Sequence, residues 1–192
     1  SACYESDLKY FRWNTVLDFQ GKDETLLHTI ADRKEHQPEA ISYYKDASKT
    51  ETTDSCSNFG SLQAINVVKR NQSGVILELE LEFQNGAVSV QSEYNMRAIL
   101  GCGITNINLL DGSSVEMSIL PSAYISIQAK GDGTYAVLGG GYGHGIGMSQ
   151  NGAQKLCGQG FDYKRILNYF YQDTELTELY QPQNTTKEEG GA

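Results

Sequence analysis

The chain has 192 residues, of which 39% are hydrophobic and 10% aromatic, so it is long enough for one domain with an ordinary hydrophobic core. Its 24 Asp and Glu outnumber 15 Lys and Arg, and the resulting net charge of −9 argues against a nucleic-acid partner, because phosphate binding needs clustered cations. No apolar stretch approaches the roughly 20 residues that cross a bilayer, and no basic leader with an apolar segment opens the sequence. We therefore expect no membrane span in this chain. Since it lacks an initiator Met, we expect a processed or trimmed piece of a longer protein.

The first elements that the sequence predicts are a strand and a short helix. Residues 10–19 are aromatic and β-branched with near-alternation, which is typical of a half-buried strand. Residues 22–35 place three aliphatic side chains on one helical stripe, and this helix should end before Pro38. Residues 42–58 are polar and lack a hydrophobic period, so we expect a long surface excursion there.

The middle of the chain predicts an antiparallel meander. The extended runs are residues 62–69, 75–83 and 87–90. Turn residues separate them, and Asn85-Gly86 in particular favours a two-residue hairpin. Glu78, Glu80 and Glu82 alternate with apolar residues, which predicts one solvated, acidic face of the sheet.

The remaining elements complete a prediction of the fold class. They are a helix over 93–100, strands over 115–120, 124–129 and 135–138, and helices over 149–156 and 162–171. Ser149 and Asp162 are the expected N-caps of the last two helices. We expect an α+β, β-rich fold with mainly antiparallel strands and a few short helices, two of them at the C-terminal end. One domain should cover residues 1–180, followed by a polar tail at 181–192.

Four cysteines, Cys3, Cys56, Cys102 and Cys157, lie about fifty residues apart, without a C-x-x-C pair. This spacing excludes a zinc ribbon and gives no reason to expect a metal or another cofactor. Buried free thiols are the favoured interpretation, and one or two disulfide bridges are the alternative.

Residues 139–150, GGGYGHGIGMSQ, form the one unusual stretch of the sequence. Alternating glycines let the backbone approach another surface and adopt φ angles closed to other residues, while Tyr142 and His144 project between them. The spacing fits neither a dinucleotide fingerprint nor a phosphate-binding loop. Asn151 stands where a nucleophile elbow around Ser149 would need glycine. A single histidine in such a loop is more often structural than functional, so both roles stay open for His144.

The same residues resemble a known family. Residues 139–153, GGGYGHGIGMSQNGA, closely resemble the signature of the stage II sporulation protein D family, also called the SpoIID/LytB domain. Residues 160–171, GFDYKRILNYFY, are similar to a second block of that family. Residues 10–13 resemble its aromatic-Arg-Trp strand, and residues 95–101 its Arg-x-x-Leu-Gly helix. The resemblance covers roughly residues 8–180.

The resemblance implies an envelope or extracellular protein that acts on peptidoglycan, anchored to a membrane, if at all, through a segment outside this chain. The implied partners are glycan strands and a cell-wall amidase. The residues carried over to the glycan groove are Tyr142, Gly143, His144, Gly145, Ser149 and Gln150. The family's Ala-rich block with its proposed catalytic Glu has no counterpart here, so no catalytic residue is assigned.

Two functions therefore stay open at this point. In the first, the chain is part of a SpoIID-like lytic transglycosylase and is inactive as this fragment, because such an enzyme needs a carboxyl group to protonate the leaving oxygen. In the second, it is a non-catalytic wall-binding or amidase-enhancing module, since a shared fold does not guarantee a shared activity. An unrelated structural domain, with glycines that only permit tight packing, is a third alternative.

Overall fold

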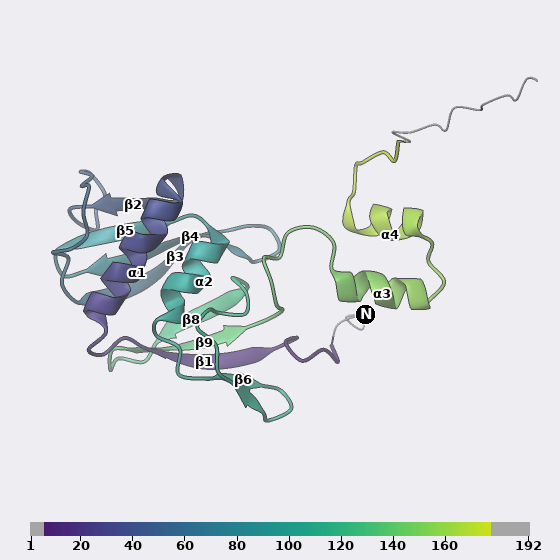
Figure 1. Cartoon of the computed structure of the whole chain (residues 1–192), viewed down its shortest axis with the longest axis horizontal. Coiled ribbons are helices and arrows are strands. Elements are labelled where there is room, and N and C mark those ends of the chain that lie inside the picture. Colours follow the sequence, from purple (N-terminus) through teal and green to yellow (C-terminus); the bar gives the residue numbers. More distant parts are fainter. Residues whose placement is uncertain (1–5, 178–192) are drawn as a thin grey trace, which may run out of the picture. The chain divides into compact units, whose positions relative to one another are not determined.

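The computed structural model describes residues 6–177 and has the predicted α+β architecture with antiparallel sheets (Figure 1). The chain divides into two compact units, residues 1–146 and 147–192. The elements of the first unit are β1 (Trp13–Asp18), α1 (Asp23–His36), the 3-10 helix η1 (Pro38–Ala40), β2 (Ile41–Tyr44), β3 (Leu62–Arg70), β4 (Ile76–Phe83), β5 (Gly86–Val90), α2 (Glu93–Gly101), β6 (Ile107–Leu109), β7 (Ser114–Val115), β8 (Ile125–Ala129) and β9 (Thr134–Gly139). The second unit contains α3 (Gln150–Gly158) and α4 (Tyr163–Phe170).

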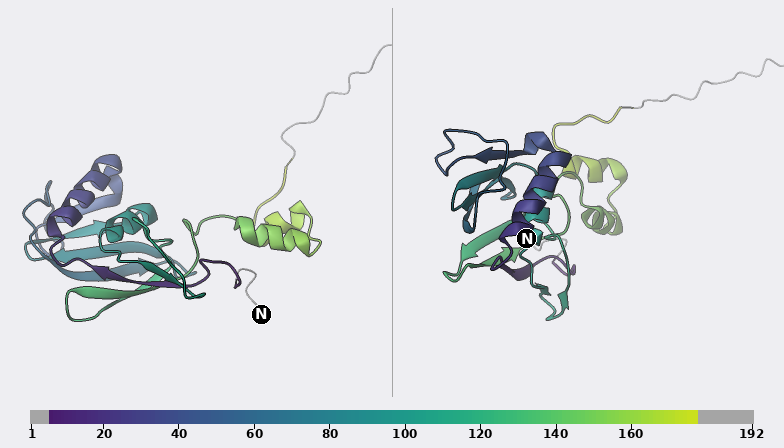
Figure 2. Two further views of the ribbon diagram at one scale, coloured as in Figure 1. Left: turned by 60° about the horizontal axis from the view of Figure 1, so that its bottom comes forward. Right: turned by 60° about the vertical axis from the view of Figure 1, so that its left-hand side comes forward.

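Two antiparallel sheets build the first unit. One has the strand order β7-β6-β1-β9-β8 and the other the order β2-β5-β4-β3. The predicted meander is confirmed, because β3, β4 and β5 pair in sequence. Helices α1 and α2 lie side by side over one face of the sheets (Figures 1 and 2). The core between these layers includes Trp13, Leu17, Leu26, Ile30, Leu79, Leu81, Ile99 and Leu100.

Helix α1 confirms the helical stripe read from the sequence. Its buried side chains are Leu26 and Ile30, four residues apart and therefore on one face. Acidic residues occupy its first turn and basic residues its last, which is the favourable arrangement for the helix dipole. The helix ends at His36, before the expected Pro38.

The expected surface excursion over residues 42–58 is partly wrong. Strand β2 occupies its beginning and pairs with β5 at the edge of the four-stranded sheet. Tyr43 and Cys56 from this segment are buried in the core. A four-residue strand is too short to show a hydrophobic period, so the pattern missed it. Strand β6 was missed for the same reason, and β7 is much shorter than the run expected over 115–120.

The acidic row of β4 is not the solvated face that the alternation predicts. Glu80 is buried, and Glu78 and Glu82 are half-buried. Lys49, in the turn after β2, places its Nζ 2.6 Å from Oε2 of Glu80. Its backbone has φ +55°, in the left-handed region that non-glycine residues seldom adopt. The Ser89 hydroxyl donates to Oε1 of Glu78 at 2.9 Å. Lys49, from a loop distant in sequence, therefore offsets part of the negative charge of this face.

Three cysteines lie among the described residues, and all three are free thiols. Cys56 is buried, as expected, and lies 3.8 Å from the Leu27 carbonyl oxygen. Cys102 is only half-buried and Cys157 is exposed, so the expectation of burial is wrong for Cys157. Cys3 lies outside the described residues.

The three thiols should differ in reactivity towards iodoacetamide. Burial raises the pKa of the Cys56 thiol, which lowers its thiolate fraction near neutral pH, and only the thiolate is nucleophilic. We expect mass spectrometry of the native protein at pH 7.5 to find Cys157 alkylated at least tenfold faster than Cys56. In denaturant, the two rates should converge. Equal rates in the native protein would contradict the described burial of Cys56.

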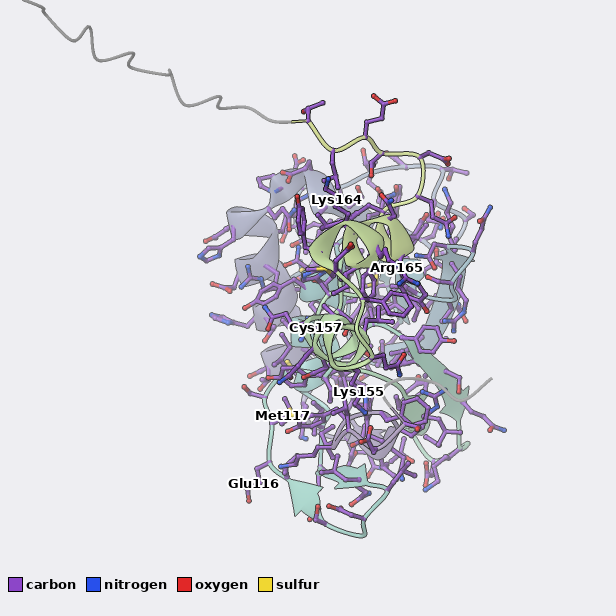
Figure 3. The ribbon with its side chains drawn as sticks, turned by 90° about the vertical axis from the view of Figure 1, so that its right-hand side faces the viewer. Glu116, Met117, Lys155, Cys157, Lys164 and Arg165 are labelled. Carbon is purple, nitrogen blue, oxygen red and sulfur yellow. The ribbon has the colours of Figure 1, made fainter. Side chains whose placement is uncertain are left out.

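The second unit is a pair of short helices. Both predicted N-caps are confirmed, since the Ser149 hydroxyl accepts from the Gly152 N–H at 3.1 Å and the Asp162 carboxylate from the Arg165 N–H at 2.8 Å. Figure 3 labels Lys155 on α3 and Arg165 on α4, two of the basic residues of this unit. The polar tail expected at 181–192 lies outside the described residues, and the predicted single domain over 1–180 stays a prediction. Within residues 6–177, no helix is long and apolar enough to span a membrane.

Candidate functional site

The glycine-rich loop begins where β9 ends beside β1. Gly139 is the last residue of β9 and pairs with Trp13 across the two strands. A Cβ on Gly139 would lie 2.1 Å from the Trp13 ring, so only glycine leaves room for the indole at this position. The indole N–H donates to the Gly141 carbonyl at 3.0 Å. Trp13 thus fixes the base of the loop from inside the core.

Main-chain hydrogen bonds hold the next part of the loop on both sides. The Gly141 N–H donates to the Tyr10 carbonyl at 2.8 Å, next to β1. The Gly143 N–H donates to the Pro121 carbonyl at 2.8 Å, in the segment before β8. The Ser122 hydroxyl, which is buried, donates to the Gly140 carbonyl at 2.7 Å. These bonds give residues 140–143 one defined path, in contrast to an ordinary flexible loop.

The expectation that the alternating glycines adopt φ angles closed to other residues is confirmed. Gly141 has φ +78° and Gly143 has φ +114°. A Cβ on either residue would meet no heavy atom within 4 Å. These two glycines are therefore needed for the backbone conformation, and the space above them is open.

Tyr142 is a predicted site residue with an exposed ring. Its side chain lies between the two glycines and is 65% exposed. One side of the ring is supported by Tyr10, with ring centroids 4.7 Å apart and planes inclined by 36°. The contact holds the Tyr142 ring while leaving much of its surface open to solvent. Such a ring can stack on an apolar face of a ligand.

His144 is also exposed, and one hydrogen bond indicates the tautomer of its neutral ring. The backbone N–H of Ile146 donates to Nδ1 of His144 at 2.8 Å. An acceptor nitrogen carries no proton, so the neutral ring has its proton on Nε2. The local turn therefore presents an Nε2–H donor to solvent.

Ser149 and Gln150 belong to the second unit. Ser149 caps α3, and Gln150 is the first residue of that helix and is exposed. The nearby Met148 N–H donates to the Tyr171 hydroxyl at 3.1 Å. Thus Tyr142, Gly143, His144 and Gly145 share the first unit, whereas the other two predicted site residues share the second.

Two neighbours of the loop, Arg12 and Tyr124, were not included among the predicted site residues. A Cβ on Gly140 would lie 2.8 Å from Nη1 of Arg12 and 3.2 Å from Cδ1 of Tyr124. Arg12 is exposed and the Tyr124 side chain is 44% exposed. Arg12 could have been found from the aromatic-Arg-Trp motif, but no local pattern marks Tyr124, which reaches the loop through the pairing of β8 with β9.

A hollow of the first unit lies away from the loop. It has a volume of about 610 Å³ and lies between α1 and residues 54–57. None of the predicted site residues lines it. Among residues 6–177, no group of three or more His, Cys, Asp and Glu side chains is placed to hold a metal ion.

Comparisons with known proteins agree with the motifs. The chain is similar to the amidase enhancer of Bacillus subtilis (strain 168), with 34% identity over 89 residues, which are 46% of this chain and 12% of that protein. It is also similar to stage II sporulation protein D of the same organism, with 36% identity over 76 residues, which are 39% of this chain and 22% of that protein. These matches confirm the resemblance to the SpoIID/LytB family. The matched segments span less than a quarter of either relative.

A family match covers more of this chain than either relative does. Residues 32–147, which include Tyr142 and His144, match the family described as a domain of unknown function, DUF8618. The chain belongs to this family. The matched range contains most of the first unit and ends just after the part of the loop that the hydrogen bonds hold.

Proposed function

We propose that this chain binds the glycan strands of peptidoglycan through the loop at residues 140–146. It does so as part of a SpoIID-like lytic transglycosylase that acts on the cell wall, at the envelope or on its extracellular side. The observation that carries the proposal is the exposed pair of Tyr142 and His144 on a backbone whose path is fixed by hydrogen bonds. The similarity to stage II sporulation protein D supports the setting in sporulation and cell-wall turnover.

The chemistry of the loop suits a neutral sugar. The apolar face of a pyranose ring can stack on the Tyr142 ring, while hydroxyl and acetamido groups accept from the Nε2–H of His144. The open space above Gly141 and Gly143 lets a polymer lie directly against the backbone. A net charge of −9 disfavours broad electrostatic adhesion to anionic wall polymers, so recognition should depend on stacking and hydrogen bonds.

Sedimentation with purified, peptide-free glycan strands tests this proposal. We expect Tyr142→Ala and His144→Ala each to weaken binding about threefold to tenfold, because a lost stacking contact or hydrogen bond costs about 0.5–1.5 kcal/mol and 1.4 kcal/mol is about tenfold. Neither change should lower the melting temperature by more than about 2 °C, since both side chains are exposed.

Two matched controls separate the loop from general surface effects. Tyr94→Ala removes another half-exposed tyrosine from the first unit, and His28→Ala removes another exposed histidine. Both variants should bind glycan strands as the unchanged protein does. If Tyr142→Ala and His144→Ala also bind normally, the loop is structural and the proposal is wrong.

The other relative favours a second candidate function, in which the chain assists a cell-wall amidase without cleaving glycan itself. The observation in its favour is the match to a protein named amidase enhancer. No predicted site residue carries a carboxyl group that could act as the acid of a transglycosylase. Glycan binding by the loop is common to both candidates.

A further inference from the structure

Arg12 is fixed in place beside the loop and has no acidic partner among residues 6–177. Its guanidinium lies over the Phe11 ring, 4.1 Å from the centroid, and Nη1 donates to the Phe11 carbonyl at 2.7 Å. Within residues 6–177, the ion pairs involve other basic side chains, and Arg12 takes part in none of them. In a chain with 24 acidic residues, an exposed and immobilised arginine without a carboxylate is a site where an external anion can bind.

The surroundings of Arg12 place it on the same surface as an aromatic ring. Because Gly140 has no side chain, Nη1 of Arg12 and the Tyr124 ring both fit beside it. A Cβ on Gly140 would approach each of them closely. Gly74 does the same on the other side of that ring, since a Cβ there would lie 2.8 Å from Cε2 of Tyr124. Trp13 faces the core, and its neighbour Arg12 is exposed, whereas Gly140 is buried beside Arg12 and the Tyr124 ring.

We propose that Arg12 and Tyr124 form an anion-binding subsite of the glycan site. This subsite binds a carboxylate carried by the strand that contacts Tyr142. This inference rests on the proposed function. A guanidinium presents a planar set of donors, and with one of them used by Phe11 the others can bind a carboxylate. Gly140 and Tyr142 are two residues apart, at most about 7 Å along the backbone, so one short oligosaccharide can reach both subsites.

Two parts of peptidoglycan can supply the carboxylate. One is the lactyl acid of N-acetylmuramic acid in a strand without peptides. The other is an acid of the stem peptide, which is attached through that lactyl group and removes its charge. Both are carboxylates and would contact the guanidinium in the same way, so the probes of the experiment must separate them.

Isothermal titration of the full chain with three tetrasaccharide probes tests the inference. The first probe is neutral N-acetylglucosamine tetramer, the second is the peptide-free N-acetylglucosamine–N-acetylmuramic acid repeat, and the third is that repeat with stem peptides. We expect at least one charged probe to bind about five- to tenfold more tightly than the neutral probe, as a partly exposed charge-assisted hydrogen bond allows. Preference for the second probe assigns the lactyl acid, and preference for the third alone assigns the peptide.

Arg12→Gln should reduce the affinity for the preferred charged probe to that for the neutral probe and leave the neutral affinity unchanged. Arg12→Lys should keep part of the preference, because it keeps the charge but not the planar donors. Lys130→Gln is the matched control, since it removes an exposed charge at the opposite end of β8 from Tyr124.

The anion-binding subsite is wrong if all three probes bind equally to the unchanged protein, or if the preference persists in Arg12→Gln. Neither result contradicts the proposed glycan site. If the unchanged protein binds none of the probes, both the proposed function and the subsite are wrong. The two failures are therefore distinguishable in one set of titrations.

Discussion

Replacing Gly139 with alanine is expected to destabilise the first unit by about 2 kcal/mol, because overpacking a filled core forces side chains and backbone to move. The added Cβ would lie 2.1 Å from the ring of Trp13, which is 3% exposed and cannot move outward without leaving the core. Trp13 also donates to Gly141, so its displacement should loosen the loop as well. Trp13 is the only tryptophan of the chain, so urea denaturation followed by tryptophan fluorescence reports on this contact directly.

Gly158→Ala is the control for this measurement. Gly158 lies in helix α3, and its φ is not positive. A Cβ added there would meet no heavy atom within 4 Å. Alanine there should be neutral or slightly stabilising, since Gly158 is the last residue of α3 and its backbone conformation is open to alanine. An unchanged denaturation midpoint and emission maximum in Gly139→Ala would contradict the close packing of β1 against β9.

Replacing Lys49 with methionine is expected to cost about 2 kcal/mol of unfolding free energy. The ammonium group is the cation beside Glu80, whose side chain is only 9% exposed, and removal of one partner leaves a buried charge uncompensated. Lys45→Met is the matched control on the same segment. Lys45 pairs with Glu51, and both side chains are more than half exposed, so its loss should cost less than about 0.5 kcal/mol.

A double-mutant cycle separates the ion pair from other effects of the Lys49 substitution. Glu80→Gln removes the charge while keeping the shape of the side chain, so Lys49→Met should cost much less in that background. Urea denaturation of the four proteins gives the coupling free energy. A coupling near zero would mean that the pair contributes nothing beyond the contacts of its side chains.

The same pair predicts how the stability depends on pH. The hydrogen bond to Glu80 raises the pKa of Lys49 above its ordinary value of 10.5, with burial acting in the opposite direction. A raised pKa in the folded state means that the stabilisation is fully present below about pH 10.5 and is lost as the pH rises through the folded-state pKa. The stability difference between the unchanged protein and Lys49→Met should therefore be constant from pH 7 to about 9.5 and shrink as the pH rises past about 10.5.

Sequence patterns predicted most of the elements in the first unit and both helices of the second. Helix α1 and strands β3, β4 and β5 were found because each is long enough to show its period or is bounded by clear turn residues. Strands β2 and β6 were missed because three or four residues carry no usable period. The acidic face of β4 was misjudged because Lys49, which pairs with Glu80, comes from a turn far away in the sequence.

The candidate site was predicted in part. The alternating glycines indicated a backbone with unusual φ angles. The exposure of Tyr142 and His144 between them follows from that backbone. The aromatic-Arg-Trp motif marks Arg12, but no local pattern marks Tyr124 or shows that both side chains approach Gly140. It depends on the pairing of β9 with β1 on one side and β8 on the other.

The sequence by itself determined the glycine pattern, the family resemblance and the antiparallel character of the sheets, because these depend on residue type and short spacing. Only the tertiary structure decided which residues stand beside the loop and which charges are buried. Hydrogen bonds and ion pairs between segments far apart in the chain fix both, and their free energy depends on distances that no one-dimensional pattern contains.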